Sequence, residues 1–234
     1  MKMIFRKLLL ILLFILILGC SSESSVPATG NTIPKVSFSY LALGDSYTIG
    51  QSVCVSCRFP EQLKVSLQNA YPNDTFSLQI IATTGWTTTN LISAINEEKP
   101  NSNYDLVTLL IGVNNQYQSQ PFSVYEQEFP QLVAKAISLA KGKKSNLIVV
   151  SIPDYAFTPF GGGSTTISSG VEKYNMFAKK YCLENNIEFV NITDITQKGL
   201  ENPDLVASDG LHPSELAYAK FVERILPKAM TILN

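Results

Sequence analysis

The chain has a single histidine, His212, and only 16% of its 234 residues are charged. Lys and Arg number 18 and Asp and Glu number 19, so neither sign is in the excess that attracts nucleic acid or acidic partners. One histidine is too few for an ordinary zinc site, which needs several His or Cys ligands. We therefore expect no metal, no other cofactor and no nucleic-acid partner.

Long apolar runs are confined to the N-terminus. Basic residues at the start of the chain precede an uninterrupted apolar run over residues 8–18, which ends at Gly19 and Cys20. The run is short for a membrane span and has the size of a signal-peptide core, although a short transmembrane anchor is the alternative. The segment resembles a bacterial lipoprotein signal, which implies that residues 1–19 are removed and that Cys20 carries the lipids.

The next segment, residues 20–35, is polar and has no apolar periodicity, so it is predicted to be a flexible tether. Residues 36–234 are long enough for one folded domain with a sizeable core. The resemblance to lipoproteins implies an exported protein of the cell envelope, on the outer membrane or facing the periplasm, that is held to the membrane by its lipid anchor. It is expected to be a monomer.

Only three cysteines follow Cys20, namely Cys54, Cys57 and Cys182. Export places them in a compartment where disulfides form. The sequence CVSC also suits a redox motif or half of a zinc site, but it lies in a predicted loop and lacks the further ligands. A disulfide between Cys54 and Cys57 is predicted, with Cys182 as a buried free thiol.

Short runs rich in Val, Ile and Leu alternate with helical patterns beyond the tether. Nearly continuous apolar runs are typical of parallel strands that are covered on both faces, and strict alternation with helices predicts a three-layer α/β/α sandwich around a five-stranded parallel sheet. The predicted strands are 37–43, 76–82, 106–111, 147–152 and 188–192. The predicted helices are 60–70, 88–98, 124–141, 171–185 and 214–233.

Polar residues follow these strands, where open α/β sheets bind their ligands. Ser46 comes directly after the first strand, in the sequence GDSY. A serine nucleophile needs a base, and His212 is the only histidine, with Asp209 three residues before it. A lone loop histidine is often merely solvated or packed, but here it accompanies a serine, a glycine and an asparagine that each follow a strand.

These residues occur in four blocks that resemble the SGNH, or GDSL-type, hydrolases, a family of esterases and lipases. GDSY matches the nucleophile block, ATTGW the glycine block, GVNN the asparagine block and DGLH the block of the catalytic acid and base. The resemblance implies the flavodoxin-like strand order 2-1-3-4-5. It also implies a catalytic triad of Ser46, Asp209 and His212. The implied oxyanion hole consists of Ser46, Gly85 and Asn114.

The chain departs from the family at Asn115, where an acid is usual, and we expect altered support of that loop. Loops after strands line clefts, so Trp86, Asn115, Asp154 and Tyr155 are candidate substrate-binding residues. Residues 160–170 form a glycine-rich insertion that is predicted to be either a mobile flap or a plain surface loop.

The function that these observations predict is hydrolysis of carboxylic esters by a serine esterase or lipase, through an acyl-enzyme. Acetylated glycans, short-chain lipids and lysophospholipids are candidate substrates. A non-catalytic glycan- or lipid-binding lipoprotein on the same scaffold is the alternative. A flavodoxin-like nucleotide or flavin binder is disfavoured, because GDSYTIG has few glycines and places an acid where a phosphate would lie.

Overall fold

Five parallel strands form one sheet in the order β2-β1-β3-β4-β5. The structure, a computed structural model, describes residues 35–234, so the predicted signal peptide, Cys20 and nearly all of the predicted tether lie outside the described residues. The order implied by the family resemblance is confirmed. The strands are β1 (Ser37–Gly44), β2 (Thr75–Ala82), β3 (Leu106–Leu110), β4 (Leu147–Val150) and β5 (Glu188–Val190).

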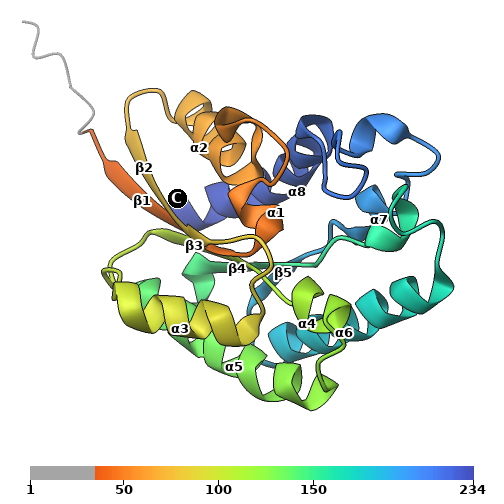
Figure 1. Cartoon of the computed structure of the whole chain (residues 1–234). Coiled ribbons are helices and arrows are strands. Elements are labelled where there is room, and N and C mark those ends of the chain that lie inside the picture. Colours follow the sequence, from red (N-terminus) through yellow and green to blue (C-terminus); the bar gives the residue numbers. More distant parts are fainter. Residues whose placement is uncertain (1–34) are drawn as a thin grey trace, which may run out of the picture. The chain divides into compact units, whose positions relative to one another are not determined.

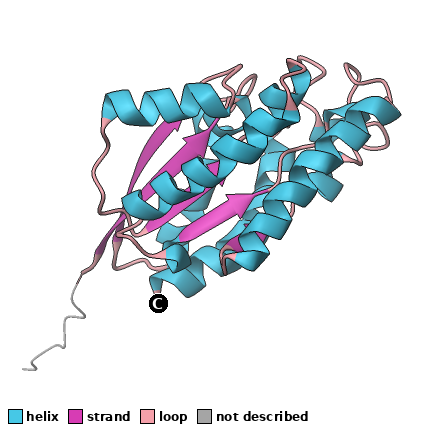
Figure 2. Ribbon diagram, turned by 90° about the horizontal axis from the view of Figure 1, so that it is seen from below, coloured by secondary structure: helices cyan, strands magenta, loops and turns pink. Residues whose placement is uncertain are grey.

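Helices cover both faces of the sheet, which confirms the three-layer prediction (Figures 1 and 2). One face carries α2 (Phe59–Ala70) and α8 (Glu215–Leu233), which pack against each other. The other carries α3 (Thr88–Glu98), α5 (Phe122–Leu139) and α6 (Thr165–Glu184). Three short helices follow strands: α1 (Ser46–Ile49), α4 (Val113–Tyr117) and α7 (Thr193–Thr196).

The centre of the sheet is apolar because β3 and β4 are buried along their whole length. Thr108 is the polar exception in β3, and its hydroxyl shares a 2.8 Å hydrogen bond with the phenol of Tyr40 from β1. That contact satisfies both buried hydroxyls. Within residues 35–234, no helix has both the length and the apolar character of a membrane span.

The predicted insertion at residues 160–170 is a loop only in its first part: residues 160–164 form turns, and residues 165–170 are helical. Helix α6 begins at Thr165 rather than at the predicted Val171, with the Ser164 hydroxyl accepting from the backbone N–H of Ile167. Gly170 therefore lies inside the helix, where a Cβ atom would stand 2.7 Å from the side-chain amide nitrogen of Gln116. The segment TTISSG is polar and without apolar periodicity, which is why its helical state left no sequence signal.

Gly44 ends β1 at a point where no side chain fits. A Cβ atom there would lie 2.1 Å from the Thr48 hydroxyl oxygen and 2.4 Å from the Leu110 carbonyl oxygen. The glycine lets α1 fold back tightly over the strand end, as such close approaches require. This turn sets the position of the residue two places later, Ser46.

Candidate active site

The register of the sheet aligns the ends of three strands. Gly44 of β1 pairs with Ala82 of β2 on one side and with Leu110 of β3 on the other. The three loops that follow these strands therefore start at the same level and carry Ser46, Gly85 and Asn114, respectively. This alignment is the reason that residues far apart in the sequence meet at one edge of the sheet.

Ser46 is the first residue of α1 and is 4% exposed. Asp45 caps this helix, because its carboxylate oxygen Oδ1 accepts a 3.0 Å hydrogen bond from the backbone N–H of Tyr47. Capping by an acid fixes the first turn of a helix and so fixes the backbone that presents the serine. The C-cap, Gly50, is left-handed with φ of 77°, which returns the chain toward solvent.

Asp209 and His212 form a hydrogen-bonded pair in the loop before α8. Asp209 Oδ2 lies 2.6 Å from His212 Nδ1, and Asp209 Oδ1 accepts from the backbone N–H groups of Leu211 and His212. The loop is closed by an antiparallel bridge between Val206 and Pro213. An Asp–His pair of this kind fixes the ring with its proton on Nδ1 and leaves Nε2 as the acceptor.

The carboxyl of Asp209 is held in its charged form. Its side chain is 30% exposed, and the associated desolvation raises its pKa. Hydrogen bonds from the Ser52 hydroxyl and from His212 outweigh that effect and hold the pKa of Asp209 well below its usual range. The acid therefore remains ionised wherever the imidazole needs a negative partner.

A cavity of about 190 Å³ joins these groups at the strand ends. It is lined by two residues of the predicted triad, Ser46 and His212, and by all three predicted oxyanion residues, Ser46, Gly85 and Asn114. Its remaining walls are mostly apolar or aromatic: Tyr47, Thr84, Val113, Tyr117, Tyr155 and Leu211. Within residues 35–234 no cluster of three or more His, Cys, Asp or Glu side chains could hold a metal ion.

The two donors expected beside the serine are both held in place. Gly85 has φ of 86°, a left-handed conformation suited to glycine, and its carbonyl accepts from the Gln118 side chain at 3.0 Å. Asn114 is 9% exposed and donates one N–H of its amide to the Trp86 carbonyl at 2.9 Å. Its amide has a second N–H, which remains for a ligand in the cavity.

Asn115, a predicted substrate-binding residue, does not line the cavity. It is fully buried. Its side-chain oxygen accepts a hydrogen bond from the backbone N–H of Thr88. Its side-chain nitrogen donates to the Thr88 hydroxyl and to the side-chain oxygen of Gln120. The residue therefore links its own loop to the start of α3. The Trp86 side chain likewise does not line the cavity, and only its carbonyl reaches Asn114.

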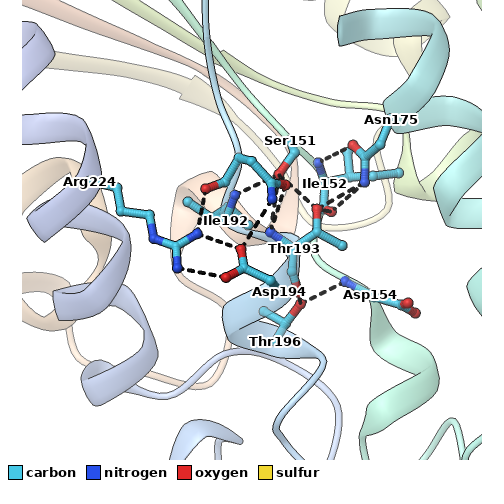
Figure 3. Close-up of polar contacts among 10 residues, drawn as sticks. Ser151, Ile152, Asp154, Asn175, Ile192, Thr193, Asp194, Thr196 and Arg224 are labelled. Atoms are coloured by element: carbon cyan, nitrogen blue, oxygen red, sulfur yellow. Dashed lines mark hydrogen bonds and ion pairs between the residues drawn. The ribbon is translucent and has the colours of Figure 1, made fainter.

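Asp154, another predicted substrate-binding residue, does not line this cavity either. It is buried, and its carboxylate accepts from Ala156, Ser168 and Gln197. Its backbone N–H donates to Thr196, at the edge of the polar network that joins the ends of β4 and β5 (Figure 3). Its neighbour Tyr155 does line the cavity, with its hydroxyl donating to Gln116.

Sequence reasoning missed an aromatic rim on the cavity. Tyr117, which is 55% exposed, contacts Phe160, also 55% exposed, with ring centroids 6.2 Å apart, and both contact Tyr155. Tyr117 follows the GVNN block by two residues, so its position one turn beyond Asn114 was the available signal. Phe160 had none, because it reaches the site through the turns that precede α6.

Cys54 and Cys57 are joined by a disulfide in the loop between α1 and α2, and Cys182 is free and buried in α6. Burial raises the pKa of the Cys182 thiol to about 12, so this sulfur is not a nucleophile.

Asp45 gives a pH dependence that is separate from the Asp–His pair. Burial raises the pKa of Asp45 to about 7, and its Oδ2 atom has no hydrogen-bond partner. In the unfolded chain an Asp titrates near 4, so from about pH 4 to 7 the folded state binds this proton more tightly. The free energy of unfolding should therefore fall across that interval.

The substitution Asp45→Asn keeps the capping oxygen and removes the titration. We expect the free energy of unfolding of the variant, relative to that of the wild type, to be a few kcal/mol higher at pH 8 than at pH 4. Urea denaturation at the two pH values measures this difference. Asp204→Asn, at an exposed position, is the matched control. A constant stability difference between Asp45→Asn and the wild type at both pH values would contradict the assignment.

The sheet order and the flanking helices are those of the SGNH hydrolase fold. A profile of the GDSL-like lipase/acylhydrolase family matches residues 42–220, so the chain belongs to this family of ester hydrolases. The predictions of the family and of an ester-hydrolysing enzyme are confirmed. A search of curated protein sequences gives no match.

Solved structures share the fold. A member of the lipolytic protein G-D-S-L family from Veillonella parvula is 20% identical, with a TM-score of 0.63 and coverage of 81% of this chain and 97% of that one. An acetylxylan esterase from Geobacillus stearothermophilus is 20% identical, with a TM-score of 0.59 over 82% and 94% of the chains. A psychrotrophic esterase from Pseudoalteromonas is 17% identical, with a TM-score of 0.59 over 84% and 98%.

Proposed function

We propose that the protein is a serine esterase that uses Ser46, His212 and Asp209 as its catalytic triad. The observation that carries this proposal is the shared cavity: the only histidine, oriented by an ionised acid, faces the same small space as a serine at a strand end. Such a constellation is recognised by its geometry and by the role of each group.

The proposed reaction begins when His212 Nε2 takes the proton of the Ser46 hydroxyl as Oγ attacks the ester carbonyl. The new C–O bond gives a tetrahedral intermediate, whose collapse breaks the bond to the alcohol. His212 returns the proton to the departing alcohol oxygen. Water then attacks the acyl-serine with His212 again as base, and the acid and the free serine are regenerated.

The negative charge on the carbonyl oxygen is proposed to be met by three donors: the backbone N–H groups of Ser46 and Gly85 and the free N–H of Asn114. Fixed donors stabilise charge that appears only in the transition state, so they act on turnover rather than on substrate binding.

Asn114→Ala should therefore lower kcat by about 10²- to 10³-fold with little change in KM. Asn114→Asp, which keeps the shape but replaces the donor with an acceptor, should be at least as inactive. Steady-state kinetics with p-nitrophenyl acetate measure both variants, and circular dichroism checks their fold. A kcat within threefold of the wild type in either variant would remove Asn114 from the oxyanion hole.

A short acyl group on a sugar alcohol is the substrate that the cavity supports best. Its volume of about 190 Å³ is below the roughly 300–1,000 Å³ of pockets for drug-sized ligands, which favours acetyl over long acyl chains. Beyond the serine, the exposed rings of Tyr117 and Phe160 offer flat surfaces for a sugar ring. One structural neighbour is an acetylxylan esterase.

The test compares p-nitrophenyl esters of two, four and eight carbons, acetylated xylan and a lysophospholipid. We expect kcat/KM to fall with chain length and acetate to be released from xylan. Preference for the eight-carbon ester or for the lysophospholipid would overturn the substrate class. Absence of hydrolysis of every ester would favour the binding protein instead.

We also propose export and lipidation at Cys20. The apolar run before Gly19-Cys20 supports this, as does the disulfide of the described domain, a bond typical of oxidising compartments. Labelled palmitate should enter the wild type but not Cys20→Ala. Label in neither protein would contradict lipidation.

A further inference from the structure

The loop from Gly50 to Arg58, between α1 and α2, is largely exposed but reaches the acid of the site. The Ser52 hydroxyl donates to Asp209 Oδ2 at 2.6 Å. The same oxygen accepts from His212 Nδ1, also at 2.6 Å. Within residues 35–234, Ser52 is the one residue outside the loop of Asp209 that donates a hydrogen bond to its carboxylate.

This contact completes the surroundings of the carboxylate. Oδ1 is bound by two backbone N–H groups of its own loop, and Oδ2 by the imidazole and the Ser52 hydroxyl. Four donors leave the carboxylate little freedom to rotate about its χ2 torsion. The Ser52 bond also withdraws charge from the oxygen that faces the ring and contributes to the lowered pKa of the Asp209 carboxyl.

Ser52 adopts a conformation that serine seldom takes. Its φ of 67° lies in the left-handed region, which is uncommon for residues other than Gly, Asn and Asp. Such conformations persist where the surrounding structure enforces them, and they cluster at functional sites. Here the loop is closed two residues later by the Cys54–Cys57 disulfide, and its Val53 side chain packs against the core.

We propose that Ser52 is a positioning residue of the triad, held against Asp209 by the disulfide-closed loop. This rests on the proposed esterase function. The hydroxyl sets the orientation of the Asp209 carboxylate and draws negative charge away from the oxygen that faces the imidazole. Without this hydroxyl, Asp209 would stabilise a positively charged imidazole more strongly.

Other titratable groups surround the pair and are common to all variants compared below. Tyr47 of α1 packs edge-on against the imidazole, with ring centroids 5.7 Å apart. Tyr155 lines the same cavity, and Asp154 lines a second, smaller cavity together with His212. Tyr218 of α8 is close enough to Asp209 for the charge of that carboxylate to raise its pKa. Burial raises the pKa of all three phenols.

The experiment measures kcat/KM for p-nitrophenyl acetate from pH 4 to pH 9 in the full-length protein. Ser52→Ala and Ser52→Gly both remove the hydroxyl, but only glycine accepts the left-handed backbone without strain. We expect both to lower kcat/KM by about tenfold, the order of one hydrogen bond to a charged group, and to move the acid limb to higher pH. Ser56→Ala is the matched control, an exposed serine of the same loop that contacts Cys54 instead.

A merely structural Ser52 would give a different pattern. The proposal would be overturned if both Ser52 variants were less stable in urea while the acid limb of their pH–kcat/KM profile stayed where it is in the wild type. It would also be overturned if Ser52→Ala lost activity and Ser52→Gly did not. If the wild type hydrolyses no ester, the proposed function itself fails. An active wild type with unchanged Ser52 variants refutes the positioning role alone.

A double-mutant cycle tests whether the disulfide acts through Ser52. Cys54→Ser with Cys57→Ser should reproduce part of the Ser52→Ala effect, including the direction of the pH shift. Adding Ser52→Ala to that pair should lower kcat/KM no further than Ser52→Ala alone, because both changes act through one contact. Losses that multiply would show that the disulfide does not act through Ser52.

Discussion

Ser46→Ala is expected to lower ester hydrolysis by about 10⁵- to 10⁶-fold, down to the residual rate that the oxyanion donors alone provide. The substitution removes the oxygen that forms the acyl-enzyme and leaves Asp45 capping α1. The fold should therefore be unchanged by circular dichroism and urea denaturation. Hydrolysis of p-nitrophenyl acetate measures the loss.

A second readout shows whether the serine itself is acylated. A fluorophosphonate reacts covalently with an activated serine, so the intact mass of the wild type should increase while that of Ser46→Ala should not. His212→Ala is the matched control: it keeps the hydroxyl but should also escape labelling, because the hydroxyl is no longer activated. More than a tenth of the wild-type rate in Ser46→Ala would contradict the proposed nucleophile.

Asp209→Asn is expected to lower kcat by about 10⁴-fold with KM nearly unchanged. The two backbone N–H groups that bond Oδ1 require an oxygen at that position, so the new amide nitrogen must replace Oδ2. There it donates toward His212 Nδ1, and Ser52 can turn its hydroxyl to accept. The imidazole is then forced to carry its proton on Nε2, where it cannot take the proton from Ser46.

The matched control for this tautomer effect is Asp204→Asn, the same change at an exposed position of the preceding turn. It should keep wild-type kinetics. Steady-state assays at pH 8 and a urea denaturation curve separate loss of chemistry from loss of fold. A fall in kcat of less than tenfold for Asp209→Asn would mean that the acid does not select the tautomer.

The sheet and the ends of its strands could be predicted from the sequence because each signal there is local. Buried parallel strands are continuous apolar runs, and β3 and β4 are buried throughout, as their composition indicates. The polar residues that come next, such as Ser46 and Asn114, are placed by the strand ends alone. Short α1 and α4 were missed, because four or five residues show no helical period.

The partners of individual side chains could not be predicted in this way. Asn115 and Asp154 follow strands as cleft residues do, yet both turn inward and bond α3, α6 or neighbouring turns. Which way a side chain after a strand points depends on the other elements that pack there, and these can lie far away in the sequence in either direction. Ser52 was missed for the same reason, since its partner Asp209 lies 157 residues later in the sequence.

A hydrogen bond joins the aromatic rim to the loop that carries Asp209 and His212. The backbone N–H of Phe160 donates to the carbonyl of Gly210, the residue that directly follows Asp209. An alcohol group that contacts the Phe160 ring would therefore lie one hydrogen bond away from the loop that carries Asp209 and His212. A substitution that displaces the Phe160 backbone would remove a support of that loop as well as change the entrance of the cavity.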